Sequence, residues 1–255
     1  MASPVSLPNK PTVLTHEGNR ALIEISALYP GYGATLGNSL RRVLYSSLEG
    51  AAITTVKIEG ASHEFSTLDG VLEDVLEICL NLKAIRLLMH EDEPQTLTIN
   101  VKGKKDVTAK DIETPSQVEV INKDAHIATL TGASSTFKVE LTVEKGVGYV
   151  QAEQDDKEKK EIGVIRLDAA FSPIVKVNFD VENMRVGDRT DYNKLLIDIT
   201  TDGTLAPEEA YEKAVSVLGE HVNAVMELEG KPAAKKPAAK KAATKKAPAK
   251  KTEKK

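Results

Sequence analysis

The sequence contains no tryptophan, one cysteine and only 4% aromatic residues, and these scarcities exclude several classes of protein. Cys79 has no second cysteine to pair with, so an internal disulfide is excluded and a reducing cytoplasm is expected. The sequence has no run of about 18 apolar residues, so no membrane span is predicted. Residues 1–10 lack the apolar segment of a signal peptide. The five histidines show no ligand spacing, so we expect no metal site in this chain.

The net charge of −4 conceals a strong asymmetry along the 255 residues. Residues 231–255 hold 11 lysines and one glutamate, a net charge of +10, so residues 1–230 carry −14. The tail has no large apolar residue and is predicted to be disordered, whereas the body has the composition of a globular protein. An acidic body with a basic tail predicts separate roles for the two parts.

The most informative stretch is residues 31–50, which begins with closely spaced glycines and continues as a predicted helix over about 35–49. Gly50 is expected to end this helix in the left-handed conformation. Gly37 and Asn38 are poor helix formers, so we expect something other than local helix stability to require small residues there. One stripe is apolar and predicted to pack into a core or against a twin subunit; it consists of Leu36, Leu40, Val43, Leu44 and Leu48.

The opposite stripe of this helix is polar and holds Asn38, Arg42, Tyr45 and Glu49. Arginine and tyrosine are frequent in recognition surfaces, so this stripe is predicted to face a partner. The alternative is an ordinary solvated helix face.

Periodicity predicts a mixture of strands and helices before residue 150. Strands are expected over 11–16 and 20–28, joined by a turn at 17–19, and over 52–59. A helix is expected over about 70–88, with Ser66, Thr67 and Asp69 as cap candidates. Its predicted buried stripe is Val71, Leu72, Val75, Leu76, Cys79 and Leu82. Antiparallel strands with one solvated face are then predicted around 97–101, 118–121, 126–130 and 137–143, with a turn at 122–124.

The remainder of the body continues this pattern. Residues 151–161 are nearly all polar and predict an exposed loop. Strands are expected over 162–181 and 192–200, the first with Val175, Val177, Phe179 and Val181 on one face. A final helix is predicted from Pro207 to before Gly230. Its common side holds Ala210, Ala214, Val217, Leu218, His221, Val225 and Leu228. The fold class is therefore predicted to be α+β.

No active site is predicted from local sequence. The glycines at 31, 33 and 37 do not fit a dinucleotide loop, because its third glycine would fall on Leu36. A tight turn that lets backbone pack closely explains them better. No local pattern suggests a Ser-His-Asp or Cys-His arrangement, and the acidic pairs lie in segments predicted to be solvated.

The basic tail suggests sequence-independent contact with nucleic acid, because clustered lysines displace counterions from the phosphate backbone. With about half of its lysines engaged, the salt slope would be roughly −4 to −5. The lysine pairs expected to make these contacts are Lys235, Lys236, Lys240, Lys241, Lys245, Lys246, Lys250 and Lys251. The alternative is a solubilising tail without a dedicated partner.

The glycine-led helix, which carries the double arginine Arg41 and Arg42, is followed by several further motifs: residues 63–67, 73–78, 80–83, 168–173, 185–195, 201–204 and 207–210. Together, and in this order, these motifs resemble the alpha subunit of bacterial RNA polymerase, and the resemblance covers about residues 12–229. It implies a homodimer in which residues 1–49 and 175–230 form a dimerisation domain of two helices on an antiparallel sheet. Residues 50–174 would be an inserted β-rich domain. It also implies that the β and β′ subunits assemble on the dimer, and that the catalytic magnesium belongs to a partner, with no cofactor in this chain.

The resemblance assigns two groups of residues. Contact with β and β′ is implied for Asn38, Arg41, Arg42, Tyr45, Lys83, Asp168, Ser172, Pro173, Arg185, Arg189, Thr190, Asp191 and Lys194. Dimerisation is implied for Leu36, Leu40, Val43, Leu44, Leu48, Val217, Leu218, His221 and Val225. Family members usually end in a small DNA-binding domain, where this chain has its tail. We therefore expect DNA contact through the whole enzyme, with crude electrostatic attachment by the tail. A free-standing nucleic-acid-binding protein and a nucleotide-binding enzyme are the alternatives.

Overall fold

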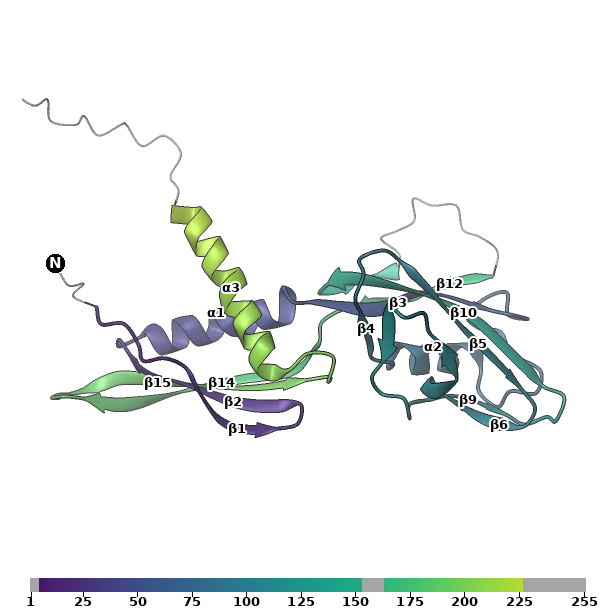
Figure 1. The fold of residues 1–255 in the computed structure, drawn as a ribbon, viewed down its shortest axis with the longest axis horizontal. Coiled ribbons are helices and arrows are strands. Elements are labelled where there is room, and N and C mark those ends of the chain that lie inside the picture. Colours follow the sequence, from purple (N-terminus) through teal and green to yellow (C-terminus); the bar gives the residue numbers. More distant parts are fainter. Residues whose placement is uncertain (1–4, 153–162, 227–255) are drawn as a thin grey trace, which may run out of the picture.

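The computed structural model describes residues 5–152 and 163–226 and shows two modules side by side along the long axis (Figure 1). We call residues 12–46 with 174–226 the helix–sheet module, and residues 49–170 the β-rich module. The chain passes between them twice, just after the first helix and just before residue 174. Sheets in both modules are antiparallel, which confirms the predicted α+β class.

The helix–sheet module has two helices on one face of a four-stranded sheet. Its elements are β1 (Thr12–Glu17), β2 (Arg20–Leu28), α1 (Tyr32–Ser46), β14 (Ile174–Val186), β15 (Arg189–Thr201) and α3 (Pro207–Met226). The strand order is β1-β2-β15-β14, so strands from the two ends of the chain are neighbours. Leu195, Ile197 and Ile199 of β15 alternate inward and form a core with Leu40 and Leu44 of α1.

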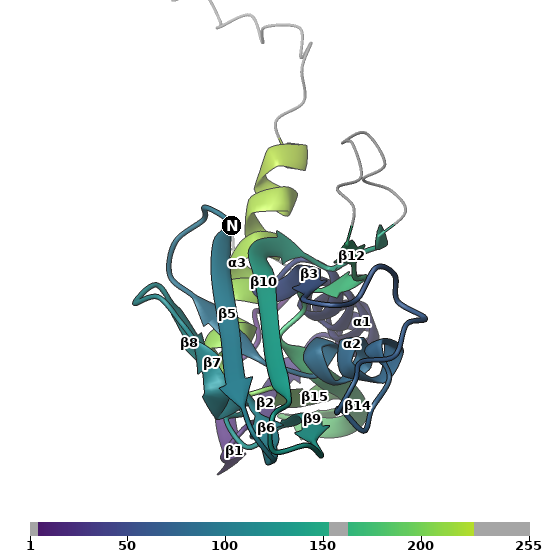
Figure 2. The same cartoon turned by 90° about the vertical axis from the view of Figure 1, so that its right-hand side faces the viewer.

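The β-rich module packs α2 against the core of a larger sheet. Its elements are β3 (Glu49–Ile58), α2 (Val75–Lys83), β4 (Leu87–Met89), β5 (Gln95–Lys102), β6 (Lys105–Thr108), η1 (Ala109–Asp111), β7 (Ile112–Glu113), β8 (Val118–Val120), β9 (His126–Leu130), β10 (Thr136–Val147), β11 (Tyr149–Val150), β12 (Val164–Arg166) and β13 (Ala169–Ala170). The main sheet runs β7-β5-β10-β3-β4-β8, with β12 also on β3. Figure 2, in which the β-rich module faces the viewer, shows β5 and β10 side by side.

Several sequence predictions are confirmed. The first two strands form a hairpin whose turn uses Gly18 at φ +59°. Along β10, Phe137, Val139, Leu141 and Val143 are buried in strict alternation. The last helix begins at Pro207 as expected, while Leu228 and Gly230 lie outside the described residues. The loop predicted over 151–161 also lies almost wholly outside them.

The first helix ends earlier than predicted, and Gly50 does not end it. Helix α1 spans Tyr32–Ser46, and Gly50 lies within β3. A Cβ atom on Gly50 would lie 1.9 Å from the carbonyl oxygen of Phe171. Gly50 is therefore required because two backbone segments cross at this point. Glu49 also belongs to β3, so the polar stripe of the helix ends at Tyr45.

The expected need for a small residue at Gly37 is confirmed. A Cβ atom there would lie 2.6 Å from Phe179 Cδ2 and 2.9 Å from Leu195 Cδ1. Gly33, one turn earlier, is likewise buried against the sheet, near Val181. These glycines let α1 lie directly on β14 and β15. Because a close-packed interior does not accommodate added atoms, larger residues at these two positions would force the helix away from the sheet.

The second helix is shorter than predicted and starts at Val75. Asp74 caps it by accepting a hydrogen bond from the Glu77 N–H at 2.7 Å. Gly70, at φ +78°, interrupts the helical pattern, so Val71 and Leu72 precede the helix and Leu72 is 71% exposed. The predicted cap candidates, Ser66, Thr67 and Asp69, were therefore wrong, because the residue that caps the helix is Asp74.

Two strand predictions also require correction. Val175 does not share a face with Val177, because the register shifts between Ile174 and Lys176 and leaves Val175 exposed. The strands on either side of the 122–124 turn do not pair with each other: β8 pairs with β4, and β9 pairs with β6. Both outcomes depend on neighbours distant in the chain.

Candidate protein-binding surface

The outer face of α1 presents one uncommitted arginine. Arg41 lies over the Phe179 ring at 5.1 Å and donates to Asn38 Oδ1 at 2.9 Å. The hydroxyl of Tyr45 accepts a hydrogen bond from the Val177 N–H at 2.7 Å. Within the described residues Arg42 has no ion pair, and its side chain is exposed. Arg42 therefore remains available to a partner, whereas Arg41 and Tyr45 also have contacts within the chain.

Lys83 and Asp168 are brought together from positions 85 residues apart. Lys83 Nζ lies 3.3 Å from Asp168 Oδ2, and the Ala152 N–H donates to Asp168 Oδ1 at 3.1 Å. The hydrogen bond from Ala152, followed by those from Tyr149 and Lys83, holds the pKa of Asp168 below its ordinary value. The carboxylate therefore stays charged on an exposed surface.

The segment that follows Asp168 joins the two modules. Phe171 is buried against Gly50 and Gly146. Ser172 Oγ accepts a hydrogen bond from the Ile174 N–H at 3.4 Å. The Pro173 carbonyl accepts one from the Asp202 N–H at 3.0 Å. Ser172 and Pro173 thus hold the crossing in place.

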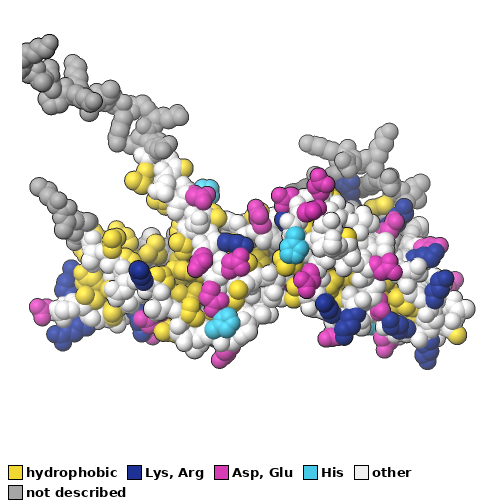
Figure 3. All heavy atoms as spheres, viewed as in Figure 1, with side chains coloured by type: hydrophobic (Ala, Val, Ile, Leu, Met, Phe, Trp, Pro, Cys, Tyr) yellow, Lys and Arg dark blue, Asp and Glu magenta, His cyan; other side chains and the backbone are white. Residues whose placement is uncertain are grey.

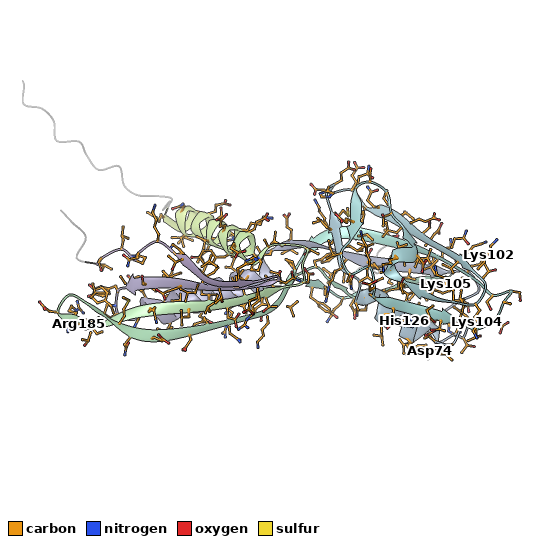
Figure 4. The ribbon with its side chains drawn as sticks, turned by 60° about the horizontal axis from the view of Figure 1, so that its bottom comes forward. Asp74, Lys102, Lys104, Lys105, His126 and Arg185 are labelled. Atoms are coloured by element: carbon orange, nitrogen blue, oxygen red, sulfur yellow. The ribbon has the colours of Figure 1, made fainter. Side chains whose placement is uncertain are left out.

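The β14–β15 hairpin forms the far end of the helix–sheet module, and Figure 4 places Arg185 at its tip, opposite Lys102 and Lys104 at the other end of the molecule. Arg189 donates to both carboxylate oxygens of Asp191 at 3.0 and 2.7 Å, which raises the pKa of Arg189 and lowers the pKa of Asp191.

Tyrosines surround this exposed pair. The Arg189 guanidinium lies 5.6 Å from the Tyr29 ring and 5.3 Å from the Tyr192 ring. Thr190 is exposed beside it, and Lys194 lies 2.5 Å from Glu182 in an ion pair between the two strands. The tip is therefore polar, aromatic and held by paired charges.

The residues assigned to dimerisation divide into two sets. Leu40, Leu44 and Leu48 are buried within their own chain and offer little surface to a twin. The half-buried ones are Leu36, Val43, Val217 and Leu218. His221 is exposed, and Val225 is 79% exposed.

Sequence reasoning missed an apolar surface on the β-rich module. Phe65 and Leu72 of the loop before α2 are exposed, as are Leu76 and Leu80 on the helix itself. Leu72 and Leu76 were expected to be buried. The spacing of four between Leu76 and Leu80, on the side away from the buried Ile78 and Leu82, was the available signal.

The described residues contain no group of three or more His, Cys, Asp or Glu side chains that could hold a metal ion. Burial raises the pKa of Cys79 to about 11, so this thiol is unreactive. None of the helices in the described ranges is long and apolar enough to cross a membrane. All of the tail lysines lie outside these ranges.

Exposed arginine, aromatic and apolar side chains on the same protein are typical of a protein-binding surface. A family model described as the RNA polymerase Rpb3/RpoA insert domain matches residues 56–172. The DNA-directed RNA polymerase subunit alpha of Symbiobacterium thermophilum is 48% identical over 216 residues, which cover 85% of this chain and 68% of the relative. The subunit of the same name from Carboxydothermus hydrogenoformans is 49% identical over 223 residues, covering 86% and 70%. The chain belongs to the family of DNA-directed RNA polymerase alpha subunits.

Proposed function

We propose that this chain is the non-catalytic assembly subunit of a DNA-directed RNA polymerase, and that two copies form the platform for the β and β′ subunits. One observation carries the proposal. The segment 168–177 joins residues from separate motifs: Asp168 pairs with Lys83, and the Val177 N–H binds Tyr45, one helical turn from Arg42. Motifs far apart in sequence thus lie along one continuous segment.

The exposed apolar residues on α2 and the loop before it support a protein partner. Phe65, Leu72, Leu76 and Leu80 lie on α2, the helix that carries Lys83, and on the loop before it. Apolar anchors with charged residues nearby are the usual composition of protein interfaces. We assign this patch, with Arg42 and Lys83, to β and β′.

The second half of α3 supports pairing with a twin. In Figure 1 this part of α3 projects away from the sheet, and residues 221–226 are all exposed. Figure 3 shows apolar side chains gathered along this upper side of the helix–sheet module. In a single copy, this half of α3 exposes Val222, Val225 and Met226 to water and is largely unsupported by the rest of the described chain. Isolated helices are only marginally stable in water. A second copy, placing its own α1 and α3 there, would cover these side chains.

The basic tail is assigned to non-specific contact with nucleic acid. The support is its charge of +10 on residues 231–255, next to a body of −14. An acidic body repels phosphate, so a basic segment is the part of the chain able to attract it.

The test is the native mass of the assembly formed when the chain is coexpressed with β and β′ of its own organism. We expect two copies with one β and one β′, and loss or weakening of this assembly in Arg42→Ala. Arg20→Ala is the matched control, because Arg20 pairs with Asp198 at 2.9 Å within the sheet. A dimer that does not bind β and β′ would refute the assembly role and leave the tail as the functional part.

A further inference from the structure

Between the described residues, an ion pair connects the two modules in addition to the two crossings of the chain. Arg86, between α2 and β4 of the β-rich module, places Nε 3.8 Å from Asp202 Oδ2 in the turn between β15 and α3. This turn lies at the side of the helix–sheet module that faces the β-rich module (Figure 1). The Asp202 side chain is only 8% exposed, so the pair is partly withdrawn from water.

Arg86 is held in place by its own module. Its backbone N–H donates to Asn122 Oδ1 at 2.7 Å, and its carbonyl accepts from the Ile121 N–H at 3.0 Å. Asn122 Nδ2 also donates to the Ala84 carbonyl at 3.0 Å. The arginine therefore projects from a fixed backbone.

Asp202 is held equally well on the other side. Its Oδ1 accepts from the Thr204 N–H at 3.0 Å and from Thr204 Oγ1 at 2.6 Å, which leaves Oδ2 for Arg86. Its backbone N–H donates to the Pro173 carbonyl at the crossing. Gly203 follows at φ +94°, and a Cβ atom there would lie 3.4 Å from Ile121 Cγ2. The turn thus fits closely against the β-rich module.

We infer that the Arg86–Asp202 pair is a positioning contact that fixes the angle between the two modules. The inference rests on the proposed function, because the assembly surface has Arg42 on one module and Lys83 on the other. A partner that touches both modules loses less freedom on binding when their angle is already set. The pair therefore acts on assembly without touching β or β′.

The test compares Arg86→Ala, Arg86→Lys and Asp202→Asn in the full chain. Asp202→Asn keeps the acceptor for Thr204 but removes the charge. The inter-module distance is measured by single-molecule energy transfer between dyes on Asn178→Cys and Lys104→Cys, both exposed positions. Labelled chains are mixed with an excess of unlabelled chain so that a dimer carries one labelled copy, and buried Cys79 stays unlabelled.

We expect Arg86→Ala and Asp202→Asn to broaden the distance distribution and to slow capture of β by about fivefold, the factor that corresponds to losing about 1 kcal/mol. Arg86→Lys should restore most of both. Arg20→Ala, which removes an ion pair inside one module, should change neither. Unfolding midpoints of all variants show whether each is folded.

Unchanged distributions in both variants would overturn the inference, as would a broadened distribution with an unchanged capture rate. If the wild-type chain fails to capture β at all, the proposed function is refuted. The distance measurement would in that case still decide whether the pair sets the angle between the modules.

Discussion

The side-chain oxygen of Asn193 accepts hydrogen bonds from the backbone N–H groups of Gly31, at 2.9 Å, and Gly33, at 3.4 Å. Asn193 lies on β15, 162 residues after Gly31, and is almost completely buried. Helix α1 has no side-chain cap of its own, so a distant strand supplies the acceptor that its first turn lacks. The cap also fixes where the glycine-led helix begins on the sheet.

Replacing Asn193 by alanine should lower the free energy of unfolding by about 1–2 kcal/mol, since the N–H groups of Gly31 and Gly33 at the start of α1 would lose their acceptor. Asn193→Asp keeps an acceptor and should cost less. The measurement is urea unfolding followed by circular dichroism. Asn178→Ala, on the exposed side of β14, is the control and should stay close to wild type. An equal loss in both alanine variants would contradict the capping role.

Gly50→Ala should destabilise the chain by about 3 kcal/mol or more, because its Cβ would meet the Phe171 carbonyl at 1.9 Å and backbone would have to move. Gly219 gives a contrasting control. It lies in α3 with nothing within 4 Å of an added Cβ, so Gly219→Ala should stabilise by about 0.5–1 kcal/mol. Thermal unfolding of the two variants should therefore shift in opposite directions; a Gly50→Ala protein as stable as wild type would disprove the close crossing.

Glu73 should make stability depend on pH in the acidic range. Burial alone would raise its pKa, but hydrogen bonds from the Thr129 N–H, at 2.6 Å, and from His126, at 2.9 Å, outweigh this and lower the pKa below the ordinary 4.5. A lowered folded-state pKa means that the stabilisation is complete above pH 4.5 and is lost as the pH falls through the folded-state value.

The free energy of unfolding of wild type should therefore exceed that of Glu73→Gln by about 1–2 kcal/mol at neutral pH. This difference should shrink as the pH drops below about 4.5. Unfolding titrations across this range provide the measurement. Glu59→Gln, which removes an exposed pair with Lys138, should show a difference close to zero throughout. A gap for Glu73→Gln that widened toward low pH would reverse the assigned sign.

Deleting residues 231–255 should weaken the binding of the assembled polymerase to DNA and reduce the magnitude of its salt slope by about 4–5. Fluorescence anisotropy over about 50–200 mM salt measures both quantities. A tail of equal length with its lysines replaced by glutamine separates charge from length. If neither variant alters the slope, the tail is a solubilising segment instead.

Sequence periodicity determined most of the elements, because alternation along β10 and the helical spacing in α1 and α3 are local properties of the chain. The ordered motifs also identified the family without any structure. The charge division between body and tail follows from composition alone.

Tertiary structure decided what depends on contacts between distant residues. Only the folded chain shows that Asn193 caps α1, that Gly50 marks a crossing and that a bulge exposes Val175. The same holds for Leu72, whose exposure follows from the interruption at Gly70. A local pattern specifies which side chains share a face, but the elements packed against that face determine whether it is buried, capped or left for a partner.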